Sequence, residues 1–345
     1  MLRDELELLR RLWFPVARVE DVGHERPAAA ELLDTKLVVY RGSGPPTVAT
    51  DRCPHRGSKL SMGRMVNGAI ECPYHGWRFS SDGNCVCVPS QPEAGPHTIL
   101  GTWPTVEKYG LIWTCLGPPL IPVPSLPLID QADHESTKEI AQGAPFDVRC
   151  GLRTVTENFF DSSHFAFVHP VTIAPETPIV PSFTVERNGW TLSWEFPFTV
   201  LDADEALLSY EVTLPSVAQF AMFCPDGAWF VLVQVVTPLG TQPVRSRSFW
   251  FVAANPAYRE RHRGLAEEVA YQATVFAEDV PVIESLDPPE VPLRSDEHVH
   301  VRADRNATAY RRLFRELLQL HRQQPVSNAI VDADVISEPA QARRG

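Results

Sequence analysis

The segments CPHRG (53–57) and CPYHGW (72–77) decide the first part of the fold. Each segment offers one thiolate and one imidazole, from Cys53, His55, Cys72 and His75. In a two-iron, two-sulfur cluster, two His can replace two Cys on one of the irons. Zinc is the alternative, because two Cys and two His also form a structural zinc site. Zinc modules usually pair Cys with Cys and His with His, so we expect the [2Fe-2S] cluster.

Short apolar runs separated by turn residues surround both segments. Asn67-Gly68 and Asp82-Gly83 lie between such runs, which is typical of tight β-hairpins. This pattern predicts a small antiparallel β domain. We assign residues 1–120 to the domain and residues 36–116 to its core. Five Pro fall within residues 117–127, a stretch too rigid and too poor in backbone donors to join a sheet. We place the domain boundary there.

The rest of the chain predicts an α+β domain with an antiparallel sheet and a long helix against it. Strand-like runs fill residues 183–255, and a long helix is expected over 256–286, followed by a short helix over 304–322. We assign residues 121–330 to this second domain. The remaining residues, 331–345, are expected to form a disordered tail.

The composition excludes several classes of protein. The net charge of −12 opposes a nucleic-acid reader or a binder of anionic membranes, since both need a basic surface. The sequence has no signal-peptide core and no apolar run of the ~18 residues that a membrane span needs. An odd count of 7 Cys over a long chain indicates a cytoplasmic protein. Five of them are interpreted as buried small apolar residues: Cys85, Cys87, Cys115, Cys150 and Cys224.

A second group of ligand-type residues lies in a helical stretch predicted over 153–168. Asn158, Asp161 and His164 are spaced by three and share one face of a helix. His169 follows five residues after His164, and both could bind one metal if the helix ends between them. The proline after His169 favours such an end. The alternative is a helix end with two surface His.

A carboxylate that could complete this group follows from the periodicity of the long helix. An apolar stripe runs along it with steps of four and three residues: Leu265, Val269, Gln272, Phe276, Asp279 and Ile283. Asp279 thus falls on the core face, whereas Glu278 points about 100° away. A carboxylate there is costly unless it is paired or bound to metal, and a salt bridge to an Arg is the alternative. Two His and one carboxylate form the facial triad of non-heme Fe(II) oxygenases.

These motifs resemble the Rieske non-heme iron, or ring-hydroxylating, oxygenases. CPHRG…CPYHGW is similar to their Rieske domain, and the family pattern N-x-x-D-x-x-H-x-x-x-x-H is matched at Asn158, Asp161, His164 and His169. The segment FAEDVPVIES resembles the family's carboxylate helix, which gives Asp279 the third ligand role. Ser58 and Tyr74 stand where respiratory Rieske proteins carry disulfide-forming Cys. The chain resembles the alpha subunits, in the style of vanillate and dicamba O-demethylases, over roughly residues 10–320.

The resemblance implies a Rieske domain followed by a START-like, helix-grip catalytic domain. It implies a [2Fe-2S] cluster on Cys53, His55, Cys72 and His75, and mononuclear Fe(II) on His164, His169 and Asp279. Electrons would come from NAD(P)H through a ferredoxin or a flavin/[2Fe-2S] reductase. O₂ would then hydroxylate or oxidatively demethylate a small organic, aromatic substrate.

The resemblance also implies a homotrimer. In that family, chains pack head to tail in a ring of three, and the Asp of the pattern links the mononuclear site to a cluster His of the next chain. Carried onto this sequence, Asp161 would link His164 to His75 or His55 of the neighbouring subunit. The alternative is an Asp161 that only orients His164 within its own chain.

Other interpretations remain open on the sequence. The protein could transfer electrons without catalysis, or bind a ligand with zinc in place of the cluster. Six aromatic residues either line a substrate pocket or belong to the core: Phe160, Phe165, Phe167, Phe220, Phe223 and Trp229. No basic motif indicates a carboxylate substrate.

The segment between Asp51 and Ser80 carries a local excess of positive charge. Its five basic residues are Arg52, Arg56, Lys59, Arg64 and Arg78, against the acidic Asp51 and Glu71. In a chain of net charge −12, this excess predicts a docking surface for an acidic electron donor. Plain solvated loops are the alternative.

Overall fold

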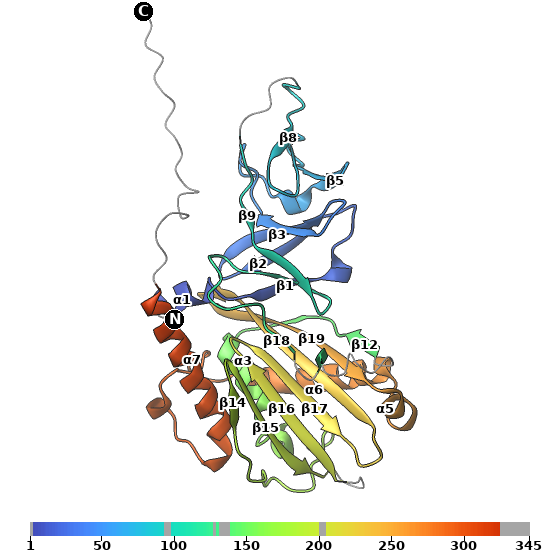
Figure 1. Ribbon diagram of the computed structural model, residues 1–345, viewed down its shortest axis with the longest axis vertical. Coiled ribbons are helices and arrows are strands. Elements are labelled where there is room, and N and C mark those ends of the chain that lie inside the picture. The colour runs from blue at the N-terminus through green and yellow to red at the C-terminus, as the bar shows by residue number, and fades with distance from the viewer. Residues whose placement is uncertain (1–2, 93–97, 127–128, 131–138, 200–204, 325–345) are drawn as a thin grey trace, which may run out of the picture.

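The computed structural model describes residues 3–92, 98–126, 129–130, 139–199 and 205–324. Figure 1 shows two parts, an N-terminal part made of small sheets and a C-terminal part built on one large sheet. We refer to residues 3–126 as the N-terminal part and to the described residues from 139 onward as the C-terminal part. The predicted tail lies outside the described residues.

The N-terminal part consists of a short helix and small antiparallel sheets. The helix is α1 (Arg3–Leu9). The first sheet has the order β1 (Phe14–Arg18), β11 (Leu111–Thr114), β10 (Thr105–Lys108). The second has the order β2 (Ala28–Leu32), β3 (Thr35–Arg41), β4 (Pro46–Thr50), β9 (Thr102–Trp103). The third has the order β5 (Arg64–Val66), β6 (Ala69–Glu71), β7 (Arg78–Phe79), β8 (Cys85–Cys87).

The hairpin turns of this part follow the predicted turn residues. Asn67 and Gly68 join β5 to β6 with φ of 52° and 78°, and Gly83 lies between β7 and β8 with φ of 84°. Positive φ at these positions is what tight hairpin turns require. Strands β1 and β2 precede residue 36 but pair with β11 and β3. The boundary near residue 120 stays a prediction.

The C-terminal part is built on one eight-stranded antiparallel sheet. Its strand order is β12 (Glu139–Gln142), β19 (Val244–Ala254), β18 (Trp229–Thr241), β17 (Val217–Phe223), β16 (Ala206–Thr213), β15 (Thr191–Phe198) and β14 (Glu186–Asn188). The eighth strand, β13 (Phe146–Val148), lies outside this order and pairs with β19. The predicted fold class, an antiparallel β domain followed by a sheet with helices against it, is confirmed.

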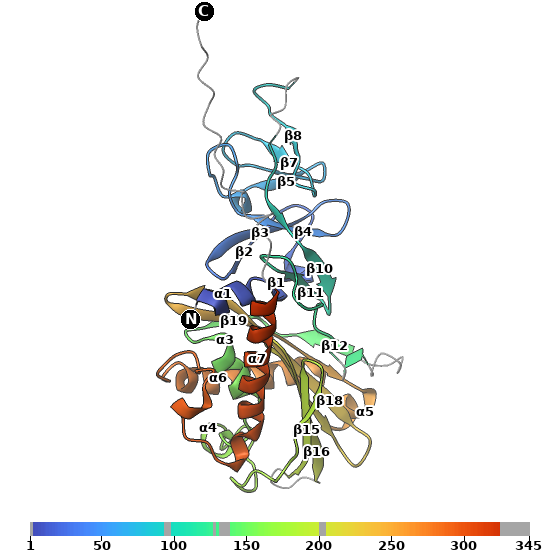
Figure 2. The ribbon, with the colours of Figure 1, turned by 60° about the vertical axis from the view of Figure 1, so that its left-hand side comes forward.

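Helices cover this sheet and its edges (Figures 1 and 2). They are α3 (Leu152–Phe160), α4 (Phe165–Val168), α5 (Pro256–Arg261), α6 (Leu265–Ile283) and α7 (Arg305–Gln323). Helix α3 packs against β17 and β18, α6 against β12 and β19, and α7 against β15. None of the described helices combines the length and the apolar composition that a membrane span needs.

The helix predicted over 153–168 is interrupted, which corrects the expectation of one continuous element. Helix α3 ends at Phe160, and Asp161 has extended backbone angles. The Oδ1 atom of Asp161 accepts a hydrogen bond from the Ser163 amide at 2.8 Å. Such a turn offers the backbone an alternative to the helix, which is the physical reason for the break. His164 and His169 therefore flank the separate short helix α4.

The helix predicted over 256–286 is also two helices. Helix α5 ends before His262, and α6 begins after Gly264, which has extended angles. Glycine is a poor helix former, so the sequence offers a break there. The break places Arg263 between the two helices, and α6 then continues through Pro281.

Buried ion pairs fix the position of α3. Glu157 accepts two hydrogen bonds from the Arg311 guanidinium of α7, at 2.7 and 2.6 Å. One turn earlier, Arg153 pairs with Glu5 of α1 and, at 2.9 Å, with Glu290. All of these side chains are nearly inaccessible to solvent. Because an unpaired buried charge is strongly destabilising, these pairs hold the two parts and α7 against α3.

Two of the five Cys outside the quoted segments are buried as predicted, namely Cys115 and Cys150. The interpretation as buried residues is wrong for Cys85, Cys87 and Cys224, which are half-buried. Burial raises the pKa of Cys115 to about 11 and that of Cys150 to about 12. These two thiols therefore stay protonated at neutral pH.

We predict that Arg311→Met lowers the free energy of unfolding by about 3–5 kcal/mol, because it leaves the Glu157 carboxylate buried without its partner. The matched control is Arg312→Met. Arg312 is 77 % exposed and pairs with Glu316 at 3.4 Å, so its loss should cost less than about 1 kcal/mol. Urea unfolding measures both. Equal stabilities of the two variants would contradict the prediction, and adding Glu157→Gln to Arg311→Met should recover part of the loss.

Candidate functional site

The two Cys-His loops have the same backbone construction. The amide of Gly57 donates to the carbonyl of Cys53 at 2.8 Å, and the amide of Gly76 donates to that of Cys72 at 3.0 Å. Both glycines have positive φ, 74° and 70°, a conformation that other residues adopt only with strain. The glycine four residues after each Cys therefore closes its loop.

The thiols of these loops lie inside the protein and the imidazoles lie near its surface. Cys53 and Cys72 are each 2 % exposed, His55 is half-buried and His75 is exposed. The two imidazole rings have centroids 4.6 Å apart, and the Trp77 ring stacks on His55 at 4.4 Å. Burial, with a contribution from Cys72, raises the pKa of Cys53 to about 11. Two thiolates at this position therefore need bound positive charge.

The spacing of the four donors favours a cluster over a single ion. A tetrahedral zinc with bonds of about 2.0–2.3 Å needs all four donors within about 4 Å of one another. In the described part of the chain, two groups of three ligand atoms lie within 4.8 Å of one another, and the Cys-His set is not among them. Two buried thiols opposite two outer imidazoles suit a two-iron cluster, which has a thiolate end and an imidazole end.

His164, His169 and Asp279 come together in the C-terminal part. The Nε2 atoms of the two His are 3.2 Å apart, and the Oδ1 atom of Asp279 lies 3.1 Å from His169 Nε2 and 3.3 Å from His164 Nε2. His169 is fully buried and Asp279 is 6 % exposed. We call these three residues the trio. Their ligand atoms converge on one point, which is the arrangement that a facial metal site requires.

The electrostatics of the trio favour a cation. Burial raises the pKa of Asp279, but its hydrogen bonds to the two His outweigh this effect and hold the pKa at about 2. Burial lowers the pKa of His164, but the carboxylates of Asp161 and Asp279 raise it to about 9. The partners of Asp279 are the two His and the Asn158 amide, which donates to Oδ1 at 3.2 Å. The alternative of a salt bridge to Arg is therefore wrong.

Glu278 is a residue of the site that the sequence reasoning missed. Its Oε2 atom lies 2.7 Å from His169 Nδ1 and accepts a hydrogen bond from Thr172 Oγ1 at 2.6 Å. A carboxylate on the far nitrogen of a metal-binding His fixes the orientation of the ring. The periodicity places Glu278 off the core face, and the only signal for its role is its position next to Asp279.

Asp161 lies beside the trio without a hydrogen bond to it. Its Oδ2 atom is 3.7 Å from His164 Nδ1, which is too long for a hydrogen bond. The His164 Nδ1 atom is buried and has no hydrogen-bond partner among the described residues. The Asp161 side chain is 44 % exposed, so part of its carboxylate faces outward. The predicted link to a neighbouring chain stays a prediction.

A cavity of about 1000 Å³ opens beside the trio. Its walls carry aromatic rings, including Phe165, Phe198, Tyr210, Phe220, Phe230 and Phe276. Of the six aromatic residues considered as lining, Phe165 and Phe220 line the cavity. Phe160 packs in the core against Trp194, Phe167 is 76 % exposed, and Phe223 and Trp229 are not among the lining residues.

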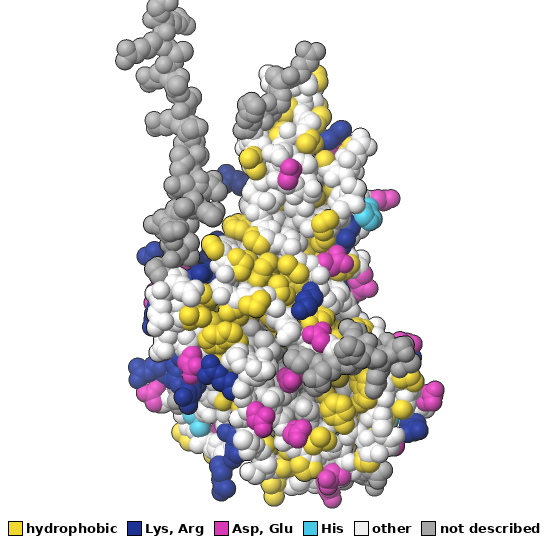
Figure 3. All heavy atoms as spheres, viewed as in Figure 1, with side chains coloured by type: hydrophobic (Ala, Val, Ile, Leu, Met, Phe, Trp, Pro, Cys, Tyr) yellow, Lys and Arg dark blue, Asp and Glu magenta, His cyan; other side chains and the backbone are white. Residues whose placement is uncertain are grey.

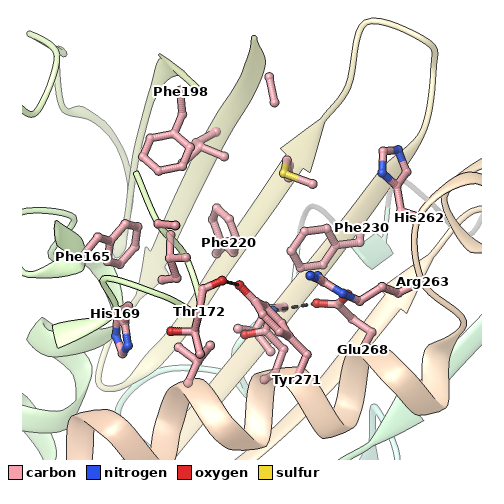
Figure 4. Close-up of a pocket in the computed structure, with 18 of the residues that line it drawn as sticks. Phe165, His169, Thr172, Phe198, Phe220, Phe230, His262, Arg263, Glu268 and Tyr271 are labelled. Carbon is pink, nitrogen blue, oxygen red and sulfur yellow. Dashed lines mark hydrogen bonds and ion pairs between the residues drawn. The ribbon is translucent and has the colours of Figure 1, made fainter. Parts of the chain in front are cut away.

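The end of the cavity away from the trio is polar. Figure 4 shows His169 and Arg263 on opposite sides, with Phe220 and Phe230 between them. Cys224, Asp226 and His262 form a second group of ligand-type residues there. Asp226 is already paired with Arg261 at 3.0 Å, so a metal would have to displace that ion pair. The trio is therefore the better candidate metal centre.

The predicted basic surface is smaller than the sequence indicates. Arg64 and Arg78 both pair with Glu71, at 2.8 and 2.7 Å. The carboxylate of Asp51 accepts hydrogen bonds from Ser61 instead of pairing with a basic side chain. Three exposed residues remain without an ion-pair partner among the described residues, namely Arg52, Arg56 and Lys59. On the face drawn in Figure 3, Lys and Arg side chains are interspersed with Asp and Glu over the C-terminal part.

Two known domain families match this chain. The Rieske [2Fe-2S] domain matches residues 12–109, and the vanillate O-demethylase oxygenase C-terminal domain matches residues 148–320. The first match contains all four Cys and His of the two loops. The second contains Asn158, Asp161 and the trio.

Similar proteins cover nearly the whole chain. Methylxanthine N1-demethylase NdmA of Pseudomonas putida is 30 % identical over 98 % of both chains. Methylxanthine N3-demethylase NdmB of the same organism is 30 % identical over 92 % of this chain and 91 % of its own.

Solved structures agree with these matches. NdmA of Pseudomonas putida CBB5 with caffeine superposes with a TM-score of 0.80 at 29 % identity, covering 93 % of this chain and 94 % of its own. Dicamba monooxygenase bound to 3,6-dichlorosalicylic acid shares the fold, with a TM-score of 0.75 at 22 % identity over 92 % of this chain and 99 % of its own. The cofactors of this family are a Rieske [2Fe-2S] cluster and a mononuclear iron. The chain therefore belongs to the Rieske non-heme iron oxygenases, as an alpha subunit with a catalytic domain of the vanillate O-demethylase type.

Proposed function

We propose that this oxygenase is a monooxygenase that hydroxylates an aromatic substrate or oxidatively removes a methyl group from it. One oxygen atom of O₂ enters a C–H bond of the substrate. The other leaves as water, with electrons and protons supplied by NAD(P)H through a reductase. When the hydroxylated carbon is a methyl group on nitrogen or oxygen, the product loses it as formaldehyde.

The observation that carries this proposal is the position of the trio at one end of an aromatic-lined cavity. His164, His169 and Asp279 would hold iron, which would supply O₂ activation there, and the loops at Cys53, His55, Cys72 and His75 would hold the cluster that supplies electrons. Asn158 and Glu278 orient Asp279 and His169 through their hydrogen bonds. The aromatic walls bind a flat apolar molecule and keep water away from the reacting carbon.

The similar proteins support demethylation over plain hydroxylation. NdmA and NdmB, which align with nearly all of this chain, are N-demethylases by name. We therefore propose a methyl group on a heteroatom of a ring compound as the preferred site of oxidation. Electron transfer or ligand binding without turnover has no comparable support, because the trio is complete.

We predict that Asp279→Ala loses the mononuclear iron and all product formation while the cluster stays reducible. Removing this carboxylate takes away one of three metal ligands, and it makes no contact with the cluster loops. Glu278→Gln is the comparison, since it removes only the charge that orients His169. It should weaken iron binding by about 10–100-fold without abolishing it.

Iron titration of apo-protein, with the visible spectrum of the cluster as the internal reference, measures both variants. If Asp279→Ala retains iron and forms product at the wild-type rate, another carboxylate is the ligand. If Glu278→Gln loses iron as completely as Asp279→Ala, then Glu278 binds the metal directly.

The arrangement of one chain supports electron transfer between chains. Figure 2 shows β5, β7 and β8, beside which the cluster loops lie, at one end of the molecule and α4 near the other end. Exposed apolar side chains flank both sites: Met62 and Tyr74 are 72 % and 61 % exposed, and Phe167 and Val171 are 76 % and 85 % exposed. Apolar surface of this kind marks contact sites between proteins. We therefore propose a head-to-tail homotrimer in which Asp161 lies between two chains.

Asp161→Asn tests this role. We predict a variant that still binds iron and still has a reducible cluster, but whose electron transfer from the cluster to the mononuclear site is slowed at least about 100-fold. The reason is that an amide cannot accept hydrogen bonds from imidazoles of two chains through two charged oxygens. Stopped-flow oxidation of the pre-reduced cluster by O₂ with substrate measures the rate. A wild-type rate, or an active native monomer, would contradict the proposal.

The reductase is proposed to dock on the exposed basic residues beside the cluster. Arg52, Arg56 and Lys59 keep their charges free of ion pairs among the described residues, and the exposed His75 lies in the same region. We predict that Arg56→Glu slows reduction by an acidic reductase, and that added salt slows the wild-type reaction because it screens charges beyond ~8 Å. Arg312→Glu, on α7, also reverses an exposed charge and should have no effect. Rates that respond to neither salt nor Arg56→Glu would exclude this surface.

A further inference from the structure

The end of the cavity opposite the trio carries an arginine that the proposed oxidation does not use. Arg263 lies in the break between α5 and α6 and lines the cavity. Its guanidinium stacks over the Tyr271 ring, 3.9 Å from the ring centroid. The side chain is 43 % exposed. In Figure 4 it extends into the cavity toward Phe230.

Most of the hydrogen-bonding capacity of Arg263 is unused. Among the described residues, it donates one long hydrogen bond, at 3.5 Å from Nη1 to Glu268 Oε2, and the Tyr258 and Tyr271 side chains also interact with it. A guanidinium carries five N–H donors in a planar fork. The contact with the Tyr271 ring restrains the guanidinium, and its remaining donors are available to a ligand in the cavity.

Glu268 holds Arg263 and is not itself free to bind a ligand. It is 0 % exposed, which is rare for a carboxylate. Its Oε1 atom accepts a hydrogen bond from Gln272 at 2.7 Å, and its Oε2 atom accepts one from the Tyr258 hydroxyl at 2.8 Å. Both oxygens therefore have protein partners. The role left to this carboxylate is to position and balance the charge of Arg263.

The charges at this end of the cavity sum to zero. The positive Arg263 faces the negative Glu268, and Asp226 is paired with Arg261. The other titratable side chains that line this end are those of His262, Cys224, Tyr258 and Tyr271. A carboxylate ligand would add a second negative charge beside the buried Glu268, which is unfavourable. A neutral acceptor uses the free N–H donors without adding charge.

We propose that Arg263 binds a carbonyl oxygen of a neutral, planar aromatic substrate at the end of the molecule away from the carbon that is oxidised. The aromatic walls at Phe220 and Phe230 would contact the ring faces, and the carbonyl would set the orientation of the molecule toward the trio. The inference rests on the proposed function only for the oxidation of the substrate at the trio. Binding at Arg263 needs neither O₂ nor a reductase, so it can be tested without turnover.

The test uses three bicyclic probes of similar shape on the iron-loaded protein under nitrogen. 1-Methyl-2-quinolone carries a ring carbonyl, 1-methylnaphthalene carries no acceptor, and 1-naphthoate carries a carboxylate. Calorimetric titration gives the dissociation constants. We expect the quinolone to bind at least about tenfold more tightly than either of the others, the effect of hydrogen bonds to a charged group.

Arg263→Met removes the donors and keeps the length of the side chain. It should weaken quinolone binding at least about tenfold and leave methylnaphthalene binding unchanged. Arg312→Met, on α7 and not among the residues that line the cavity, is the control and should change neither. The proposal is overturned if Arg263→Met binds the quinolone like the wild type, if methylnaphthalene binds as tightly as the quinolone, or if no probe binds at millimolar concentration.

A second variant tests the charge argument. Glu268→Gln keeps the shape of the side chain and leaves Arg263 with an unbalanced positive charge. The preference should then shift at least about tenfold from the quinolone toward naphthoate. If the wild type already prefers naphthoate, the substrate is an aromatic acid and the neutral-carbonyl proposal is wrong.

Discussion

The burial of one carboxylate beside two imidazoles is the constraint on which the catalytic part depends. Asp279 is almost inaccessible to solvent, and a charge in that position is tolerated only with His164 and His169 against it. Its neighbours Asn158, His164 and His169 lie more than 100 residues earlier in the sequence. The positions of α3 and α6 relative to each other must therefore be fixed. The ion pairs of Arg153 and Glu157 do this for α3, and the packing of α6 on β12 and β19 does it for Asp279.

Helix α6 carries three carboxylates with three different partners along the cavity. Asp279 faces the two His of the trio, Glu278 holds the outer nitrogen of His169, and Glu268 holds Arg263. The same helix therefore supports both the metal end and the polar end of the cavity. Aromatic rings from the sheet fill the space between. This division explains how one site can orient a flat molecule and oxidise it at one end.

The sequence predicted the elements that chemistry or periodicity dictates and missed those set by local turns. Loop spacing identified the Cys-His set, and the stripe on α6 placed Asp279 on the buried face, where the structure has it. The breaks at Asp161 and at His262 to Gly264 were missed, because a side-chain turn and a single glycine compete only weakly with helix propensity. Glu268 lies four residues before Gln272 and therefore on the same side of the helix. It was not predicted to be buried, because charged side chains are usually exposed. Arg263 carried no motif.

The metal content of protein purified without oxygen tests the central claim most directly. Cys53, His55, Cys72 and His75 with the trio should give about three irons and about two acid-labile sulfides per chain, since a two-iron cluster and one mononuclear iron are both present. Stoichiometric zinc without sulfide would contradict the cluster. The trio would be contradicted as a metal centre if the iron content per chain equalled the sulfide content and the protein neither turned over substrate nor took up added iron.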